Sequence, residues 1–509
     1  MQSMIDPRGN SWLFEWDSNG RLIKDSDPDQ GFTGLTRTEG KNSFTVTTTT
    51  AAENRITSYM STALAGGEIH KTISLPNGRI NQVSLGADFS VQTTFADGTK
   101  VYETKAGDPR FSMLAPITAS LAIDTPAGLA YRLTRERTTT FTDPADSFTM
   151  ETLAETVTVN GRTQTSSYAA DTQTWTELSP QGRQIVTTVD NLCRVAEIQV
   201  PGLQFYSFSY DSRGRIAQTG QGTRLSNYGY DTETGYLEVM TNPLNETITF
   251  ARDSIGRTTT LTLPDNTAWG FEWDKNSTLI VLTEPGGLSH TFTCTKANQL
   301  ESYESPLGAT ETFYYDKDRR LVKRQYPSGD ALQWLYNTYD QLATFKTPEG
   351  DHSFTYDATT GLRSQAVSRD GQQIDYSYDG NLLTSAAWSG MVNGSVAYSY
   401  NNDLLISQLQ YGGQSLAVNY DQDGLLTGVG TTTLGRDTGN GLLTNVSHGD
   451  FHINYTRNAY GEIKTATALQ NTTTLYDVNY SYNDLGRITQ KAETIGGTTI
   501  TWGYEYNSV

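Results

Sequence analysis

Carboxylates recur at regular places along this 509-residue chain. A close pair of carboxylic acids is what hydrolysis of a glycosidic bond requires, so these aspartates are the first candidates for chemistry. Their regular placement after aromatic strand patterns indicates another role, because aspartate in such a position caps a turn by bonding the backbone two residues on. We therefore expect turn caps and no catalytic residue. The aspartates are Asp211, Asp231, Asp253, Asp274, Asp316, Asp357, Asp379 and Asp421.

A second candidate site is the run His448-Gly-Asp450-Phe-His452. In a strand, His448, Asp450 and His452 share one face and offer two imidazoles and a carboxylate to a metal such as zinc. The chain has only five histidines, which makes the cluster notable. The alternative is ordinary strand polarity beside a glycine turn, and we favour that interpretation.

A third candidate, Asp25-Ser-Asp27-Pro-Asp29, spaces its oxygen atoms as a calcium loop does. The glycine comes one residue late, at Gly31, and Thr36 stands where the bidentate acid belongs, which excludes an EF-hand. A solvated turn is the default interpretation, with a calcium site as the alternative. We expect no metal and no cofactor to be required.

Tryptophan rings are the remaining candidates, because sugars stack on exposed aromatic faces. Their period-2 placement favours packing within a sheet instead. The tryptophans considered are Trp175, Trp269, Trp334, Trp388 and Trp502.

The elements that must position all these residues repeat every 21 residues. In the stretch 201–216, Tyr206, Phe208 and Tyr210 alternate with serines, which predicts a strand with one aromatic face. The strand stops at Asp211-Ser-Arg-Gly214, and a second strand runs back from Arg215. A proline window supplies the opposite turn, so one unit is a hairpin plus a return turn. The period is marked by Pro180, Pro201, Pro243, Pro264, Pro285, Pro306, Pro327 and Pro348, with Gly222 in the vacant slot.

Each unit has an aromatic residue before the turn, a polar cap, and often glycine and arginine after it. Aromatic residues of neighbouring units should lie opposite one another across the sheet, where such pairs add about 0.2–1 kcal/mol each. Two windows that begin at Pro7 and Pro264 both end in Phe-Glu-Trp-Asp and lie 257 residues apart. The repeat positions that we expect to be structural are Tyr210, Asp211, Gly214, Arg215, Tyr230, Asp231, Trp273, Asp274, Tyr315, Asp316, Tyr356, Asp357, Tyr378, Asp379, Tyr420, Asp421, Tyr482, Gly486 and Arg487.

The repeat divides the chain into three regions. Residues 1–35 hold an initial repeat unit, residues 36–179 form an irregular β region with longer strands, and residues 180–509 form the regular array. The only candidates for helices, at 111–123 and 386–391, are poor. The chain opens and stops inside a repeat, so we interpret it as part of a longer protein.

Composition excludes several classes of function. Apolar residues make up 36% and charged residues 18%, which suits a β surface with much area better than a thick core. The net charge is −19, and Lys and Arg are not clustered as nucleic-acid binding would require. No segment approaches the roughly 20 apolar residues that span a bilayer. The two cysteines, Cys193 and Cys294, are expected to be buried free thiols, with a disulfide as the alternative.

With turns of the form Y-x-Y-D-x-x-G-R-L every 20 to 22 residues, the chain resembles the YD-repeat family. This family includes bacterial rearrangement-hotspot (Rhs) and wall-associated proteins, the cocoon subunits of Tc toxins, and the teneurins. The resemblance covers residues 7–24 and 180–509 well and the rest loosely. The family's C-terminal core, with its DP-x-G motif and self-cleaving aspartates, is absent, so no catalytic residue carries over.

The resemblance implies an all-β fold in which antiparallel hairpins are wound as a spiral sheet into a hollow shell. Such a shell encloses a C-terminal toxin or other cargo segment of the same polypeptide, and the protein is secreted or lies at the cell surface. The first alternative is an adhesion module whose outer face binds glycans or a partner cell. A glycan-cleaving enzyme ranks last. Because an open spiral exposes edge strands, we expect either a homodimer or capping by residues 36–179 to protect them.

Overall fold

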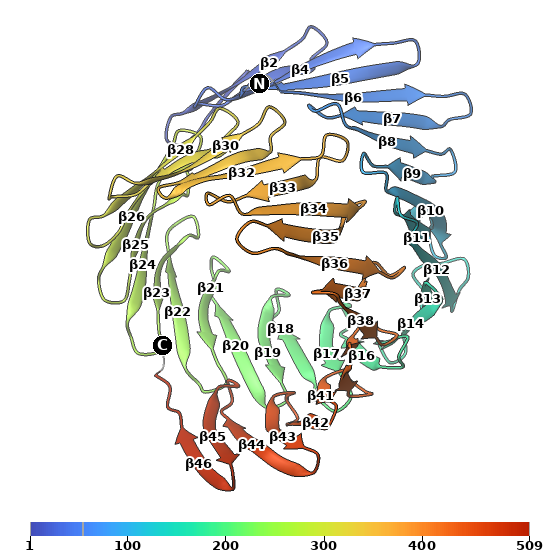
Figure 1. Cartoon of the computed structure of the whole chain (residues 1–509), viewed down its shortest axis with the longest axis vertical. Helices are drawn as coiled ribbons and strands as arrows, with labels where there is room; N and C mark the ends of the chain where they lie inside the picture. Colours follow the sequence, from blue (N-terminus) through green and yellow to red (C-terminus); the bar gives the residue numbers. More distant parts are fainter. Residues whose placement is uncertain (1, 53–54, 508–509) are drawn as a thin grey trace. The chain divides into compact units, whose positions relative to one another are not determined.

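The computed structural model describes residues 2–52 and 55–507, and these residues form strands and turns without a helix (Figure 1). The expected all-β class is therefore confirmed. Both poor helix candidates lie in strands, at β11 (Ser112–Asp124) and β35 (Leu382–Ser389). Every described pairing joins consecutive strands and is antiparallel, as in β18–β19 and β28–β29.

The first half of the chain contains these strands: β1 (Ser3–Ile5), β2 (Ser11–Trp16), β3 (Leu22–Ser26), β4 (Phe32–Glu39), β5 (Ser43–Thr50), β6 (Ile56–Ala63), β7 (Ile69–Ser74), β8 (Ile80–Leu85), β9 (Val91–Thr94), β10 (Lys100–Asp108), β11, β12 (Ala130–Phe141), β13 (Met150–Val159), β14 (Arg162–Ala169), β15 (Thr174–Leu178), β16 (Gln184–Val189), β17 (Val195–Gln199), β18 (Tyr206–Tyr210), β19 (Ile216–Gln221), β20 (Arg224–Tyr230), β21 (Leu237–Thr241), β22 (Thr247–Arg252) and β23 (Thr258–Thr262).

The second half contains these strands: β24 (Ala268–Trp273), β25 (Leu279–Thr283), β26 (Ser289–Cys294), β27 (Leu300–Glu304), β28 (Thr310–Tyr315), β29 (Leu321–Gln325), β30 (Ala331–Tyr336), β31 (Leu342–Thr347), β32 (Gly350–Tyr356), β33 (Arg363–Val367), β34 (Gln373–Asp379), β35, β36 (Gly394–Tyr400), β37 (Ile406–Tyr411), β38 (Gln414–Tyr420), β39 (Leu426–Val429), β40 (Thr432–Arg436), β41 (Leu443–His448), β42 (Phe451–Arg457), β43 (Ile463–Gln470), β44 (Thr473–Tyr482), β45 (Ile488–Ile495) and β46 (Thr498–Gly503).

The chain divides into two compact units. Unit 1 comprises Met1–Lys105, Leu121–Tyr131 and Ala268–Tyr398, and unit 2 comprises Ala106–Ser120, Arg132–Thr267 and Ser399–Val509. Each unit thus combines two runs of consecutive hairpins that lie far apart in the sequence. In Figure 1 the runs of unit 1 are blue and yellow to brown, and those of unit 2 are green and red.

In the repeat hairpins the register shifts by one residue at the last strand residue before the turn, which is often aromatic. In β18–β19, Ser209 is opposite Gln218 but Tyr210 is opposite Ile216. Two residues on one strand therefore face one on the other, which is a β-bulge that bends the hairpin near its tip. The same shift occurs before the turns after β2, β28 and β44. The repeating motif consequently includes a fixed bend as well as a turn.

The sheet has almost no enclosed core. Among the described residues only five apolar side chains are buried: Leu153, Val189, Ala297, Val418 and Val478. The chain exposes 28668 Å², whereas a compact monomer of 56.0 kDa is expected to expose about 18,000 Å². The hairpins therefore form a thin layer with solvent on both faces, as the low apolar content predicts.

Three strands between residues 112 and 159 are longer than most strands of the regular array. β11, β12 and β13 contain 13, 12 and 10 residues, whereas β27, β29 and β33 contain 5 each. The region boundaries that we expect at residues 35 and 179 stay a prediction.

Candidate functional site

The repeat turn is organised by its aspartate. In the turn after β18, Asp211 Oδ1 accepts the backbone N–H groups of Arg213 and Arg215, each at 2.9 Å. Its other oxygen, Oδ2, accepts Arg215 Nε at 2.7 Å. Gly214 has a φ of 83°, which glycine adopts without strain. Both carboxylate oxygens of Asp211 therefore accept hydrogen bonds from its own turn.

The same constellation recurs at other turns. Asp253 accepts the N–H groups of Ile255 and Arg257, and Arg257 Nε donates to its second oxygen at 2.6 Å. Asp316 binds Asp318 N, Arg320 N and Arg320 Nε in the same way. Asp211, Asp253 and Asp316 thus each cap the turn of their own hairpin. Asp379 instead ends β34 and accepts Thr125 Oγ1 and the Ala127 N–H, so the expectation of a turn cap there is wrong.

In several repeats, the arginine that directly follows the turn connects its repeat to the next one. The Arg215 guanidinium lies over the Tyr230 ring with 4.1 Å to the ring centroid. In return, Tyr230 Oη donates to the carbonyl of Ile216 at 2.8 Å, and Arg215 Nη1 donates to the Gly235 carbonyl at 2.7 Å. We call this arrangement the Arg–Tyr link. It recurs at Arg194–Tyr210, Arg320–Tyr336 and Arg487–Tyr506.

The sequence predicts aromatic pairs across strands, and the structure contains several of them. Ring centroids are 5.0 Å apart in Tyr168–Trp175, 5.5 Å in Phe292–Tyr303 and 5.4 Å in Trp334–Phe345. Arginine, however, is the neighbour of the repeat tyrosine in the links above. The period-2 pattern does not reveal this role; the signal for it is an arginine at the end of a turn that lies 15 or 16 residues before a tyrosine, as in three of the four links.

Replacing Arg215 with alanine is expected to lower the free energy of unfolding by about 1 kcal/mol. The variant loses one cation–π contact, the hydrogen bond to Gly235 and the ion pair with Asp211, and all three are partly exposed to solvent. Urea unfolding followed by tyrosine and tryptophan fluorescence measures the change. Arg369→Ala is the matched control, because Arg369 contacts only the exposed Asp370 among the ion pairs of the described residues. An equal loss in both variants would contradict the role of the link.

A second set of contacts joins the two runs of each unit. In unit 2, Arg183 reaches Asp421 at 2.7 Å and Asp423 at 2.5 Å, and Arg224 reaches Glu462 at 2.6 Å. In unit 1, Arg55 binds Asp318 and Asp340, and Thr125 donates to the buried Asp379 at 2.6 Å. We call these contacts the inter-run clamps. They join neighbouring hairpin tips of the two runs by ion pairs and hydrogen bonds, and we call this line of contacts the seam.

Two of the clamp carboxylates, Asp421 and Glu462, favour the ionised form. Burial alone would raise the pKa of Asp421, but hydrogen bonds from Arg183 and its positive charge outweigh burial and lower the pKa from its ordinary value of 3.8. Burial and Arg224 act in the same opposed way on Glu462, and the pKa of that group is also lowered. The ionised forms are therefore the ones that stabilise the folded seam.

Stability is expected to fall in acid for this reason. A carboxyl group whose pKa is lower in the folded chain than in the unfolded chain contributes stability above its unfolded pKa, and loses it as pH falls through the folded pKa. The thermal unfolding midpoint should be level from neutral pH to about pH 5 and should drop at lower pH. Circular dichroism melts between pH 2 and pH 7 test this. A midpoint that stays level down to pH 3 would contradict it.

The acidic run in the turn after β3 is used for turn and clamp bonds. Asp27 Oδ1 accepts the N–H groups of Asp29 and Gly31, and Asp27 Oδ2 accepts Arg319 Nε at 2.9 Å. Asp29 Oδ2 accepts the N–H of Ala297 at 2.8 Å. Asp25 lies in β3, outside this turn. The described residues contain no group of three metal-ligating side chains here or elsewhere.

The metal site considered at His448, Asp450 and His452 requires one continuous strand, and the structure has a glycine turn there instead, as in the favoured interpretation. Gly449, with a φ of 55°, and Asp450 form a two-residue turn between β41 and β42. His448 is opposite Phe451 and Ser447 is opposite His452, so the two imidazoles lie on different faces of the sheet. His448 Nδ1 bonds Thr432 Oγ1 at 3.0 Å, and His452 Nδ1 bonds Ser447 Oγ at 2.9 Å. The three residues are not brought together.

Both cysteines are free, but only one of them is sheltered. Cys294 is half-buried, and burial raises the pKa of its thiol. Cys193 is exposed, which corrects the expectation of a buried thiol. It occupies the place in its turn that glycine holds after Asp211, and it has the same left-handed backbone, with φ at 60°. Cys193 therefore lies at the tip of a turn and not in a core.

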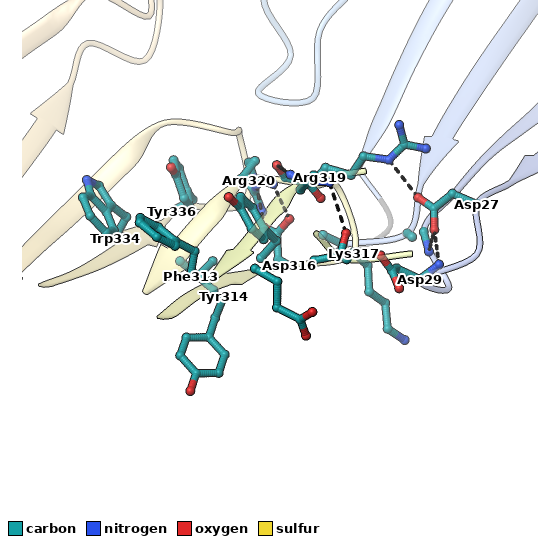
Figure 2. A pocket seen from close by; sticks show the side chains of 18 of the residues that line it. Asp27, Asp29, Phe313, Tyr314, Asp316, Lys317, Arg319, Arg320, Trp334 and Tyr336 are labelled. Atoms are coloured by element: carbon teal, nitrogen blue, oxygen red, sulfur yellow. Dashed lines mark hydrogen bonds and ion pairs between the residues drawn. The ribbon is translucent and has the colours of Figure 1, made fainter. Parts of the chain in front are cut away.

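A groove in unit 1 brings together aromatic and charged residues from both runs (Figure 2). Its volume is about 770 Å³, and we call it the aromatic groove. Strands β28 and β30 supply Phe313, Trp334 and Tyr336, and the turn after β3 supplies Asp27 and Asp29. The other lining residues are Gly31, Ala51, Ala52, Thr295, Gln299, Glu301, Thr312, Tyr314, Tyr315, Asp316, Lys317, Arg319, Arg320, Val322 and Leu335.

The entire chain, residues 1–509, matches the family described as Teneurin YD-shell. The chain belongs to the teneurin YD-shell family. The resemblance to YD-repeat proteins is thereby confirmed, and the role of this YD-shell chain is that of a structural shell segment. None of the described residues lies in a helix with the length and hydropathy needed to cross a membrane.

Solved structures with a similar fold come from Tc toxins. The YD-shell chain is 12% identical to a chain of the Tc holotoxin pore of Photorhabdus luminescens, with 95% of this chain and 31% of that chain covered and a TM-score of 0.45. It is 13% identical to a chain of the TcdB2-TccC3-Cdc42 structure, with 97% and 28% covered and a TM-score of 0.36. It spans less than a third of either chain. No curated protein matches it.

Proposed function

We propose that these residues form part of the wall of a hollow shell that encloses a toxin or another cargo segment of the same polypeptide. The observation that carries this proposal is the separation of the clamped residues in the sequence. Clamp partners are 238 to 243 residues apart in the contacts of Asn160, Arg183 and Arg224 in unit 2. They are 254 to 292 apart in the contacts of Arg55, Thr125 and Asp27 in unit 1.

The order of the clamps supports a spiral winding. In unit 2, Asn160, Arg183 and Arg224 contact residues 403, 421 and 462, so both runs advance in the same direction along the seam. Neighbouring coils of one spiral have this property, because every position meets the position one coil later. In both units the clamp partners lie about one coil apart in the sequence. A wall of this kind is extended by the addition of hairpins.

The thinness of the sheet supports enclosure. A layer with few buried apolar side chains and solvent on both faces has an area far above that of a compact protein of equal mass. Such a layer is suited to surrounding a volume. We also propose that the protein is a secreted or cell-surface component, as its shell role suggests.

Small-angle scattering and electron microscopy test the wall. A compact 509-residue protein is expected to have a radius of gyration of about 23 Å. We expect a larger radius and, in the product of the complete gene, density inside a β wall. A solid body with a radius near the compact value would overturn the proposal. A hollow body whose interior stays empty in the complete gene product would overturn the cargo role alone.

We also propose that the terminal strands need protection. The described partner of β1 is β2, and that of β46 is β45, so each has one edge without a described neighbour. Edge strands of this kind promote self-association. Either a homodimer or capping by residues 36–179 would cover them. Analytical ultracentrifugation with hydrogen exchange decides between these, and a monomer whose two terminal strands exchange freely would contradict both.

A further inference from the structure

We propose that Tyr303 of unit 1 is a covalent modification site, where the phenol oxygen accepts an acyl group from an activated ester with His290 as the general base. This activity goes beyond the shell role, because a wall needs no reactive side chain in order to enclose a cargo. A nucleophile, a base and a third group that orients the base are the parts of such a site. Tyr303, His290 and Glu284 supply them.

Three successive strands bring these residues together. His290 lies in β26, Tyr303 lies in β27, and Glu284 lies in the turn after β25. Tyr303 is opposite Phe292, and Phe292 lies two residues from His290 on the same face of β26. His290 and Tyr303 are therefore diagonal neighbours on one face of the sheet, and long side chains in such positions reach one another.

The hydrogen bonds fix the direction of proton transfer. Glu284 Oε1 lies 2.8 Å from His290 Nε2, and His290 Nδ1 lies 2.8 Å from Tyr303 Oη. An ionised carboxylate only accepts hydrogen bonds, so Nε2 carries the proton of the neutral imidazole and donates it to Glu284. Nδ1 is then an acceptor, and the Tyr303 hydroxyl donates to it. In this arrangement the imidazole can take the phenol proton.

Ring packing holds the hydroxyl against its base. The ring centroids of His290 and Tyr303 are 5.8 Å apart, and the ring planes differ by 14°. Phe292 stacks on Tyr303 with 5.5 Å between centroids. These contacts restrict the motion of the two reacting groups before a reagent arrives. The side chains of His290 and Glu284 are 19% and 37% exposed, so the site is open to reagents from solution.

The carboxylate opposite Tyr303 is neutralised. Glu311 of β28 is opposite Tyr303 in the β27–β28 pair. Arg324 pairs with Glu311 at 2.6 Å, and Arg324 Nε also donates to it at 2.9 Å. A free negative charge at this place would oppose the development of negative charge on the phenol oxygen. The ion pair with Arg324 reduces that opposition.

The reaction is a single acyl transfer. Tyr303 Oη attacks the carbonyl carbon of the ester while its proton moves to His290 Nδ1. The bond between that carbon and the leaving oxygen breaks, and His290 returns the proton to the leaving oxygen. The products are an O-acyl tyrosine and an alcohol, so atoms and charge balance without an oxidant or a reductant. Glu284 touches no reacting atom and is a positioning residue that orients His290 and offsets its transient positive charge.

Acetylation by p-nitrophenyl acetate at neutral pH tests the proposal in the full chain. Peptide mass spectrometry over time measures the rate at each tyrosine. Tyr303 is expected to react at least about tenfold faster than Tyr59. Tyr59 is the internal control, because it is 43% exposed and, among the described residues, its hydroxyl has no histidine partner. A Tyr303 rate equal to or below that of Tyr59 would overturn the proposal.

His290→Ala tests the base directly. This variant is expected to lower the Tyr303 rate to about that of Tyr59, and imidazole added to the buffer should restore part of the rate, because it replaces the missing base. A residue that only packs against Tyr303 would give no response to imidazole. An unchanged rate in His290→Ala, or the absence of rescue, would overturn the role of His290.

Glu284→Gln tests the positioning residue with a milder change. The amide is neutral and cannot offset the charge of His290, so the Tyr303 rate should fall severalfold. Glu304→Gln is the matched control, because Glu304 lies on the opposite face of β27 and should leave the rate unchanged. Equal rates in both variants would overturn the role of Glu284. The Tyr59 rate and the strand content by circular dichroism should stay constant in every variant, which separates lost reactivity from lost folding. Scattering tests the shell proposal separately, so the two can fail independently.

Discussion

Asp108→Ala is expected to lower the free energy of unfolding by about 3 kcal/mol. Asp108 is 2% exposed and lies between two guanidinium groups of unit 2. It accepts Arg110 Nε at 3.0 Å, the Arg110 backbone N–H at 2.9 Å and Arg137 Nη1 at 2.7 Å. The side-chain hydrogen bond from Arg110, together with that from Arg137, holds the pKa of Asp108 well below its usual range. Removing the carboxylate leaves two cations near each other without it.

Urea unfolding, with hydrogen exchange across residues 108–112, measures this effect. Asp108→Asn keeps the shape and one acceptor but removes the charge, so its loss should be smaller than that of alanine. Asp370→Ala is the matched control, because Asp370 forms an exposed ion pair with Arg369 and its removal should cost less than about 0.5 kcal/mol. If Asp108→Ala behaves as this control does, the buried cluster is not important for stability.

Arg183→Ala is expected to have the second largest effect, about 2–3 kcal/mol. The Arg183 side chain is 11% exposed and bonds two carboxylates of the other run, Asp421 and Asp423. Without the guanidinium, these neighbouring charges repel one another in a sheltered place. Ser179 Oγ still donates to Asp423, so the seam is weakened and not erased.

Hydrogen exchange gives this prediction a distinctive result. Protection should fall at residues 179–183 and also at residues 421–425, although these segments lie about 240 residues apart in the sequence. Arg183→Lys should recover part of the loss, because one ammonium group replaces a two-pronged donor. A loss of protection confined to residues 179–183 would show that the clamp does not connect the runs.

Local structure could be predicted well because it depends on nearest neighbours in the sequence. Alternation around Tyr206–Tyr210 and the Asp211–Gly214 turn contain the information for one hairpin, and period 21 repeats it. The metal-site alternative at His448 failed for a local reason as well. A two-residue turn at Gly449 and Asp450 interrupts the alternation, and counting every second residue does not detect that interruption.

Contacts between distant hairpins could not be predicted from alternation. Nothing in the repeat states that Arg55 meets Asp318 or that Arg183 meets Asp421, because these depend on how many hairpins complete one coil. One signal was present. The windows that begin at Pro7 and Pro264 are 257 residues apart, and this spacing lies among the clamp separations of unit 1. Recurrence of a longer motif thus marks the coil length.

The groove illustrates the same division. Trp334 was expected to pack within the sheet, with sugar stacking as the alternative, and its neighbours Phe313 and Tyr336 share its face only because of the strand register. The acids of the turn after β3 come from the other run and join the groove through Arg319 and Ala297. Residues separated by almost 300 positions gather there through tertiary structure alone.

The Arg–Tyr link has a direction, and this gives the wall a natural order of construction. The Arg215 guanidinium contacts the ring of Tyr230, which is synthesised after it. The Tyr230 hydroxyl in turn bonds the Ile216 carbonyl, which is synthesised before it. A nascent chain can therefore secure each hairpin as it emerges, with a single unfinished rung at its growing end. During synthesis from the amino terminus, each hairpin would form in turn and would be fixed by the Arg–Tyr link to the following repeat.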